Sequence, residues 1–263
     1  MTKNVLVLFT LCLLVNLSCS KNNSSSPPKS DVNLKSGLLV YLDFNGVVAD
    51  SSGNNNPAAI AGNGSLSYDE HGNANSAFNG NGDGGRVLVT NNGSIKFDTA
   101  FSVSCDVMVK SLGICTYVSM VNDASGYGAS FAFGTDLLQN QNLAFGVVDT
   151  TANCNGNNTV QNTPLLNPSF LLEPYSWYNA IAIFHKGVME IYINGKLVGS
   201  MISGPAKVNL CSNAQFTIGD FGGGEAGQPG FIQNGINGKL DEVRLYNRVL
   251  NADEIAELSK NFQ

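Results

Sequence analysis

The sequence predicts an all-β protein, an antiparallel jelly-roll β-sandwich that ends in a short C-terminal helix. Three observations predict this fold. Short apolar stretches recur along the chain, separated by turn-forming residues that include 29 glycines among 263 residues. Residues 101–109 alternate between apolar and small or polar side chains, which is typical of a half-buried strand. Only 13% of the residues are charged, a composition typical of loop-rich extracellular β proteins.

The overall charge argues against one class of partner. The formal net charge is −6, and the basic residues do not cluster. Because nucleic-acid binding depends on a basic surface that neutralises phosphates, we expect no nucleic-acid partner.

The N-terminus has the pattern of an export signal. A lysine-containing start is followed by an apolar run over 5–15, which is too short to span a bilayer. The run ends in Asn16-Leu17-Ser18-Cys19, and a small residue directly before cysteine resembles the cleavage site of bacterial lipoproteins, although Asn16 stands where that site prefers leucine. We therefore expect residues 1–19 to be a lipoprotein signal peptide with Cys19 as the lipidated residue. The alternative is ordinary secretion with Cys19 unmodified.

The segment after Cys19 predicts a tether. Residues 20–36 consist mainly of Ser, Asn, Lys and Pro, with too few apolar side chains to offset the entropy of ordering, so they should be disordered. The segment resembles the start of outer-membrane lipoproteins in Bacteroidetes-type bacteria. We expect a domain held at the cell envelope, on the outer membrane, that contacts the membrane through the lipid anchor only. Whether it faces the periplasm or the cell surface stays open.

Four cysteines remain once Cys12 and Cys19 are set aside: Cys105, Cys115, Cys154 and Cys211. They allow three pairings, and their spacing is not that of a zinc site. Cys105 lies in phase with the apolar residues of its predicted strand, which makes it a buried thiol or a core disulfide partner. We expect at least one disulfide that involves loop cysteines, and the pairing stays open.

Ten apolar or alternating runs predict the strands of the sandwich. In chain order they are residues 38–44, 101–109, 117–121, 130–133, 143–148, 177–184, 188–193, 196–201, 216–219 and 239–246. Asn194-Gly195 joins two of these strands and predicts a type I′ hairpin turn. Trp177, the only tryptophan, is expected in the core. The sequence has no internal repeat and no second domain.

Residues 252–258 predict the one helix. Asn251 can cap its first turn, and Glu254 stands three residues later, as a capping box requires. Ile255 and Leu258 share a face that can dock on the sandwich.

Several short motifs, taken in order, resemble one family. They are Tyr41-Leu42-Asp43-Phe44, the run 50–56, Ala77-Phe78-Asn79-Gly80, Phe101-Ser102-Val103-Ser104, Trp177-Tyr178, the run 191–198, the run 237–248 and the run 250–255. This order resembles the laminin-G-like jelly-roll domains of the concanavalin-A-like lectin/glucanase superfamily, and it assigns residues 37–263 to one such domain. The resemblance implies the fold but leaves the function open, because this fold hosts lectins, adhesion modules and hydrolases.

A calcium site is the sharpest chemical hypothesis. The loop from Asp50 onward is dense in carboxylate and amide oxygens, the ligands that calcium prefers. The resemblance implies that the first and last strands are neighbours, which would bring Asp241 or Glu242 close to this loop. We expect Asp50, Asn54 and Asp241 to hold a structural calcium ion. The alternative is that Asp50 and Asn54 cap turns, while Asp241 pairs with Arg244 or with a backbone amide.

Carbohydrate binding requires an exposed aromatic ring beside amides, carboxylates or arginine in a shallow groove. The aromatic residues of the predicted loops are Tyr68, Tyr127, Phe221 and Phe231, and we expect them to contact the ligand. The alternative is that these rings only cover loops or pack beneath them.

Catalysis is not expected. The glucanases of this superfamily carry Glu-x-Asp-x-x-Glu on one strand, and this sequence lacks that motif. Asp241 and Glu242 are adjacent, so a regular strand would point them to opposite faces. His71 and His185 lie in predicted turns, where we expect them to be solvated.

Together these observations predict a non-catalytic cell-envelope binding lipoprotein, monomeric, whose ligand is an extracellular glycan. The alternative is a protein-interaction or adhesion module of a surface assembly, and the third option is a glycoside hydrolase. An adhesion module should show a broad exposed apolar patch. A hydrolase needs two carboxylates about 5–10 Å apart in a cleft.

Overall fold

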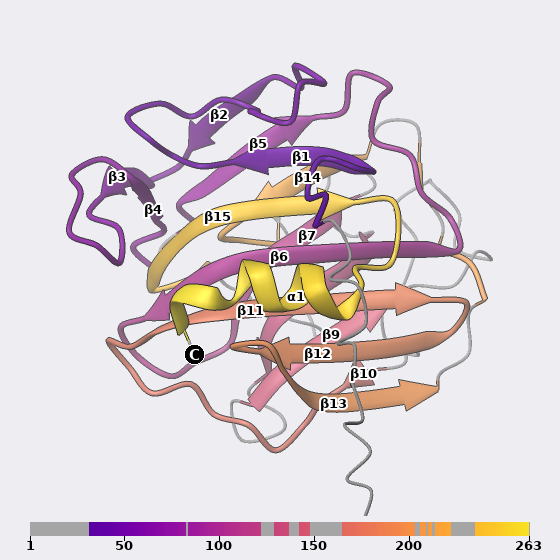
Figure 1. Ribbon diagram of the computed structural model, residues 1–263. Helices are drawn as coiled ribbons and strands as arrows, with labels where there is room; N and C mark the ends of the chain where they lie inside the picture. Colours follow the sequence, from indigo (N-terminus) through magenta and orange to yellow (C-terminus); the bar gives the residue numbers. More distant parts are fainter. Residues whose placement is uncertain are drawn as a thin grey trace, which may run out of the picture. The chain divides into compact units, whose positions relative to one another are not determined.

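Two antiparallel β-sheets and one short helix make up the fold (Figure 1). The computed structural model describes residues 32–82, 84–121, 129–136, 142–147, 165–202, 206–208, 210–211, 214–221 and 235–262. Within these ranges the predicted all-β sandwich with a C-terminal helix is confirmed. The described part of the chain contains no helix that is long and apolar enough to span a bilayer.

The first sheet has eight strands, in the order β13-β12-β11-β6-β15-β4-β3, with β1 also paired to β15. Their bounds are β1 (Leu38–Leu42), β3 (Ser65–Ser67), β4 (Ala77–Asn79), β6 (Ala100–Val109), β11 (Trp177–His185), β12 (Val188–Ile193), β13 (Lys196–Ile202) and β15 (Gly238–Tyr246). The first and last of these strands in the sequence are therefore neighbours, as the resemblance implied.

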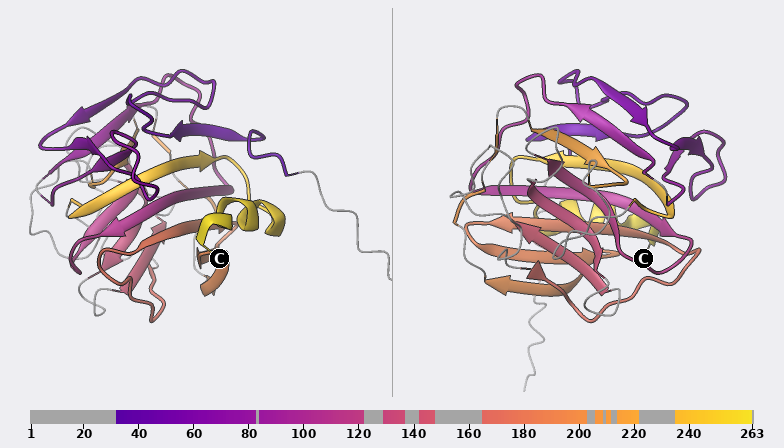
Figure 2. Two further views of the ribbon diagram at one scale, coloured as in Figure 1. Left: turned by 60° about the vertical axis from the view of Figure 1, so that its left-hand side comes forward. Right: turned by 180° about the vertical axis from the view of Figure 1, so that it is seen from behind.

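The second sheet has seven strands, in the order β10-β9-β8-β7-β14-β5-β2. Their bounds are β2 (Ala58–Ala61), β5 (Arg86–Thr90), β7 (Cys115–Val121), β8 (Ala129–Asp136), β9 (Asn142–Val147), β10 (Leu165–Leu166) and β14 (Gln215–Ile218). The view from behind in Figure 2 brings these strands forward.

The hydrophobic core lies between the two sheets. In β6, Phe101, Val103 and Cys105 face inward, and the Phe101 ring lies 4.6 Å from the ring of Phe131 in β8, centroid to centroid. Because side chains alternate along a strand, the alternate residues of β6, including Asp106, lie on the outer face of the first sheet. This outer face carries the helix and the candidate site.

Helix α1 (Ala252–Leu258) packs on that outer face, where Ile255 joins a small apolar cluster with Ile181 and Tyr246. The predicted capping box is present, because Asn251 accepts a hydrogen bond from the Glu254 amide while Glu254 accepts one from the Asn251 amide. A 3-10 turn, η2 (Lys260–Phe262), follows.

The predicted hairpin turn has the expected backbone conformation, whereas the predicted burial of Trp177 is wrong. Asn194 and Gly195 both have positive φ, as the predicted type I′ turn requires. Trp177 was expected in the core but is only half-buried, because it stands at the first position of β11.

The cysteines fall into two groups. Cys105 and Cys115 are buried free thiols, and burial raises the pKa of the Cys115 thiol to about 11. Cys211 is disulfide-bonded. Cys154 lies outside the described residues, so the pairing stays a prediction.

Candidate functional site

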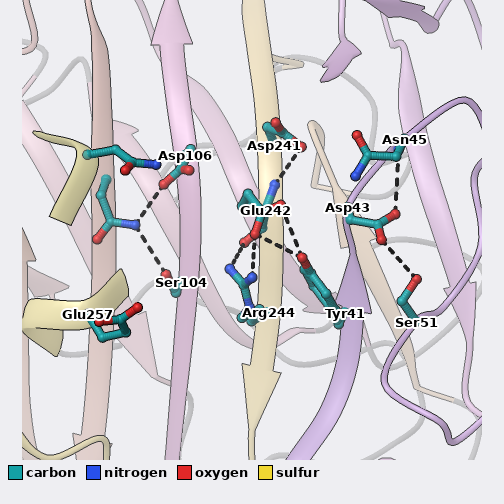
Figure 3. Close-up of polar contacts among 12 residues, drawn as sticks. Tyr41, Asp43, Asn45, Ser51, Ser104, Asp106, Asp241, Glu242, Arg244 and Glu257 are labelled. Atoms are coloured by element: carbon teal, nitrogen blue, oxygen red, sulfur yellow. Dashed lines mark hydrogen bonds and ion pairs between the residues drawn. The ribbon is translucent and has the colours of Figure 1, made fainter. Parts of the chain in front are cut away.

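A polar pocket of about 350 Å³ lies on the outer face of the first sheet. Its walls come from several parts of the chain: Leu34 before β1 and Asn45 after it, residues 69–73 between β3 and β4, the strands β6 and β15, and the residues at and after the end of α1. Figure 3 shows the side chains that β6 and β15 contribute. Segments that are far apart in the sequence therefore build one concave surface.

Asp106 of β6 and Asp241 of β15 stand directly opposite each other in the antiparallel pairing, so both side chains lie on the same face. They are 5% and 8% exposed. Asp106 Oδ1 accepts a hydrogen bond of 2.7 Å from Asn179 Nδ2, and Asn179 Oδ1 in turn accepts one of 2.8 Å from Ser259 Oγ. Asp241 Oδ1 accepts a hydrogen bond of 2.7 Å from the Glu242 amide. Two buried carboxyl groups thus share one pocket.

A β-bulge in β15 places Glu242 beside Asp241. The pairing with β6 shifts by one residue between Asp241 and Arg244, and Glu242 takes a φ of 51°, a conformation that residues other than glycine adopt at a cost. Asp241, Glu242 and Arg244 consequently all line the pocket. The expectation that Asp241 and Glu242 point to opposite faces is therefore wrong, because it assumed a regular strand.

Arg244 is held against the sheet by two partners. Its guanidinium carbon lies 4.1 Å from the centroid of the Tyr41 ring, and the group forms an ion pair with Glu242. The Tyr41 hydroxyl donates a hydrogen bond of 2.9 Å to Glu242 Oε2. Glu242 and Arg244 therefore form one wall of the pocket with Tyr41 packed against them, and the charges of the ion pair largely cancel (Figure 3).

The carboxyl groups of Asp106, Asp241 and Glu70, elsewhere in the pocket, all have raised pKa values. Burial raises the pKa of Asp106 to about 8, and the nearby Glu70 and Glu242 add to this shift. Burial also raises the pKa of Asp241 to about 8, with contributions from Glu242 and Asp106. The pKa of Glu70 is raised by burial too, and its Oε2 is buried without a hydrogen-bond partner. These surroundings disfavour negative charge unless a ligand supplies a positive one.

The predicted calcium ligands do not come together. Asp50 Oδ1 accepts from the amides of Tyr41 and Ser52, and its Oδ2 accepts from the amide and side chain of Asn56, all at 2.8–3.0 Å. Burial alone would raise the pKa of Asp50, but these hydrogen bonds hold it below its ordinary value. Asp50 thus fixes its own turn, which was the alternative interpretation.

The other two predicted calcium ligands also act elsewhere. Asn54 Nδ2 donates to the carbonyl groups of Leu38 and Leu39, while Asp241 lines the pocket together with neither Asp50 nor Asn54. Among the described residues no group of three or more His, Cys, Asp or Glu side chains has the arrangement of a metal site. Each of the three residues thus has another role in the structure, and a calcium ion held by them stays a prediction.

The four predicted aromatic contacts divide. Tyr68 is 59% exposed, directly before the pocket residue Asp69. Phe221 is only 3% exposed and packs on Ala129 and Ala132, so its ring is not available for stacking and this expectation is corrected. Tyr127 and Phe231 lie outside the described residues.

Sequence reasoning missed two pocket residues in particular, Asp106 and Glu70. Asp106 was assigned to a strand, but nothing in the sequence showed that it would face Asp241. Glu70 and His71 were assigned to a turn. His71 is exposed, and its Nε2 lies 3.1 Å from Glu70 Oε1. The signal that was available was the density of Asp, Glu and Asn in residues 69–73.

The chain matches one protein-family model, described as the concanavalin A-like lectin/glucanases superfamily, over residues 79–256. Among curated proteins none matches the chain in sequence.

Solved structures of low identity share the fold. Domain 4 of AbnA, a GH43 extracellular arabinanase from Geobacillus stearothermophilus solved with arabinotriose, is 18% identical with a TM-score of 0.62, covering 84% of this chain and 98% of that one. The botulinum neurotoxin DC binding domain in complex with SialylT is 19% identical, with a TM-score of 0.61. The same domain in complex with rat synaptotagmin II is 18% identical, with a TM-score of 0.62. In both cases the matched region covers 88% of this chain but only 53% of the toxin domain, so the chain spans about half the length of these domains.

Proposed function

This chain belongs to the concanavalin A-like lectin/glucanase superfamily, and from that premise we propose that it is a non-catalytic, monomeric binding module whose ligand is a carbohydrate. The supporting observation is the exposed side chain of Tyr68, which directly precedes the pocket residue Asp69 in the chain. An aromatic ring can stack on a sugar face, while Asn45, Asn73 and Arg244 supply donors and acceptors for its hydroxyl groups. Two of the similar structures were solved with saccharides or sialylated ligands, which is in keeping with such a ligand.

Lys239 holds Tyr68 in place. Its Nζ donates a hydrogen bond of 2.7 Å to the Tyr68 carbonyl and lies 6.0 Å from the centroid of the ring. A ring whose position is fixed before binding loses less entropy when a ligand stacks on it.

The pair Asp106 and Asp241 is poorly suited to hydrolysis. Glycosidases assign opposite protonation states to their two carboxyl groups, one acid and one base or nucleophile. Here burial raises the pKa of both groups to about 8, so both favour the protonated state at neutral pH. This supports binding over catalysis.

Tyr68→Ala is expected to weaken glycan binding roughly tenfold, since an aromatic contact contributes about 1 kcal/mol or more beyond its buried area. The measurement is a glycan-array screen of the full-length protein, with calcium and with chelator, followed by titration of the best ligand. Tyr175→Ala is the matched control, because Tyr175 is another exposed tyrosine whose neighbours in the chain do not line the pocket. Correctly folded protein that binds no glycan would defeat the proposal.

The alternative ligand is a surface protein, and one observation favours it. Leu197 and Ile202 are exposed on β13, an edge strand of the first sheet, and Ile202 is 88% exposed. An exposed apolar edge strand can pair with another chain. A negative glycan screen would make a pull-down from the native cell surface the next experiment.

We also propose that the module is a lipoprotein of the cell envelope, anchored at Cys19. Cys19→Ser is expected to move the protein from the membrane fraction to the soluble fraction, because a lipid-modified cysteine is the proposed attachment. Fractionation of cells that express either form measures this. Cys12→Ser is the matched control and should leave the protein in the membrane fraction; identical fractionation of wild type and Cys19→Ser would contradict the anchor.

A further inference from the structure

The pocket carries more acidic than basic groups. Its lining includes the carboxyl groups of Asp69, Glu70, Asp106, Asp241, Glu242 and Glu257, against the basic groups of His71, Arg244 and Lys260. Each basic group already has a carboxylate partner: His71 with Glu70, Arg244 with Glu242 and Lys260 with Glu257. The carboxyl groups without a basic partner are those of Asp69, Asp106 and Asp241. Asp69 accepts three hydrogen bonds from residues 71 and 73 of its own turn, which leaves Asp106 and Asp241 for a ligand.

Each of these two aspartates keeps one oxygen for a ligand. Both side chains are more than nine-tenths buried. Asp106 uses Oδ1 to bind Asn179, and Asp241 uses Oδ1 to bind the Glu242 amide. Within the described part of the chain, Oδ2 of Asp106 and Oδ2 of Asp241 have no hydrogen-bond partner. Both Oδ2 atoms are accessible from the pocket that the two residues line. In the same pocket Glu70 Oε2 is buried without a hydrogen-bond partner. Buried polar atoms without a partner are rare in folded proteins, so this oxygen marks a place where a donor is missing.

A divalent metal does not match this arrangement. Calcium takes 6–8 oxygen ligands, and the described residues contain no group of three carboxylate, His or Cys side chains in metal-binding arrangement. A primary ammonium group is compact and carries three donors but no acceptor. It needs only a few acceptors and prefers charged ones, because such hydrogen bonds are shorter and stronger than neutral ones.

We propose that Asp106 and Asp241 bind a protonated primary amine of the ligand, so that the carbohydrate this pocket selects is an amino sugar with a free amine. The inference rests on the proposed function, since it names the class of sugar for the same site. The pocket volume of about 350 Å³ lies at the small end of ligand pockets, which suits one sugar unit of a longer glycan. Burial raises the pKa of both carboxyl groups, which agrees with a site whose counter-charge comes from the ligand.

The test compares two ligands that differ in one group. The β-1,4-linked trisaccharide of glucosamine carries free amines, whereas its N-acetylated counterpart carries neutral amides on the same backbone. Full-length protein is titrated with each by calorimetry at pH 7 and about 0.15 M salt, where charges farther apart than about 8 Å are largely screened. We expect the free-amine trisaccharide to bind at least about tenfold more tightly, the factor that 1.4 kcal/mol gives.

Three variants tie that preference to the pocket. Asp106→Asn and Asp241→Asn should each reduce the preference to less than about threefold, because each removes a carboxyl group that can give up its proton and bind the ammonium group as a charged acceptor. Asp98→Asn is the matched control, since it removes the same charge from an exposed side chain outside the pocket, and it should keep the preference. The unfolding temperature of each variant verifies that it folds.

The other outcomes are distinct. Equal affinity for both trisaccharides, or an equal loss in all three variants, would overturn the amine proposal while leaving glycan binding intact. Protein that binds another glycan but neither trisaccharide would do the same. A protein that binds no glycan on the array would overturn the proposed function itself. Stabilisation by calcium that Asp241→Asn abolishes would show that the missing positive charge is a metal ion, and would also overturn the amine proposal.

Discussion

Asp241→Asn should raise the unfolding temperature at pH 8 by several degrees and leave it almost unchanged at pH 4. Asp241 is only 8% exposed, and burial raises the pKa of its carboxyl group to about 8. Asparagine has the shape of the protonated acid but cannot ionise. The variant therefore keeps the hydrogen bond from the Glu242 amide and removes the cost of a buried charge.

The direction follows from proton linkage. In the unfolded chain Asp241 ionises near its ordinary pKa of 3.8, while in the folded protein it holds its proton up to about pH 8. The folded state thus binds more protons between these values, so stability falls as the pH rises from about 4 to about 8. Each unit of pKa difference corresponds to about 1.4 kcal/mol. The total is on the order of a few kcal/mol, and each kcal/mol shifts the unfolding temperature by roughly 2–4 °C in a domain of this size.

Several other titratable and charged groups lie around Asp241 and contribute to the pH dependence of stability. The groups that face Asp241 are Asp106 from β6, residues 69–71 from the β3–β4 segment, Glu242 and Arg244 from its own strand, and Glu257 and Lys260 from the C-terminal end. Thermal unfolding followed by circular dichroism at pH 4, 6 and 8 measures the effect. Asp98→Asn should show no such dependence, because that side chain is 66% exposed. A stabilisation equal at all three pH values would count against a buried protonated pair.

Arg248→Met should lower the free energy of unfolding by about 3 kcal/mol. Both terminal nitrogens of Arg248 bind Glu254, each at 2.7 Å, and the Glu254 side chain is only 4% exposed. Arg248 also donates to the carbonyl groups of Ser36 at 2.7 Å and Asn33 at 3.1 Å. Removing one partner of a buried pair leaves an uncompensated charge, which typically costs about 3–5 kcal/mol. Urea unfolding at pH 7 measures the change in free energy.

Lys260→Met is the matched control for this charge. Lys260 pairs with Glu257, but both side chains are well exposed, so the loss should stay below about 1 kcal/mol. Arg248→Lys should recover only part of the stability, because lysine cannot form the two parallel hydrogen bonds. Equal losses for Arg248→Met and Lys260→Met would contradict the special role of the buried pair.

The sequence predicted the sandwich well because strand alternation and turn residues are local signals. The long strand β6 and the hairpin of β12 and β13 were assigned almost to the residue, and Asn251 and Glu254 form the expected capping box. The short strands β2, β3, β4, β5 and β10 were missed, since two to five residues carry too little periodicity. Their pairing depends on neighbours that are distant in the sequence.

The candidate site was predicted less well, for a different physical reason. Its geometry depends on register and on one bulge. Asp106 meets Asp241 only through the pairing of β6 with β15, and Glu242 turns into the pocket at a positive φ without a glycine to signal it. Of the two predicted aromatics within the described residues, Tyr68 is exposed and directly precedes the pocket residue Asp69, whereas Phe221 is buried.

The contacts of Arg248 also determine how the domain bears mechanical load. A force that pulls on the chain before Asn33 acts on the hydrogen bonds of Arg248 before it acts on β1, because Arg248 donates to the carbonyl groups of Asn33 and Ser36. Arg248 passes this force to Glu254 in the first turn of α1 and, through the backbone, to β15, which is also the pairing partner of β1. Tension from the N-terminal side is thus shared by the strand that carries Asp241, so a ligand bound there would be held by the part of the fold that resists the pull.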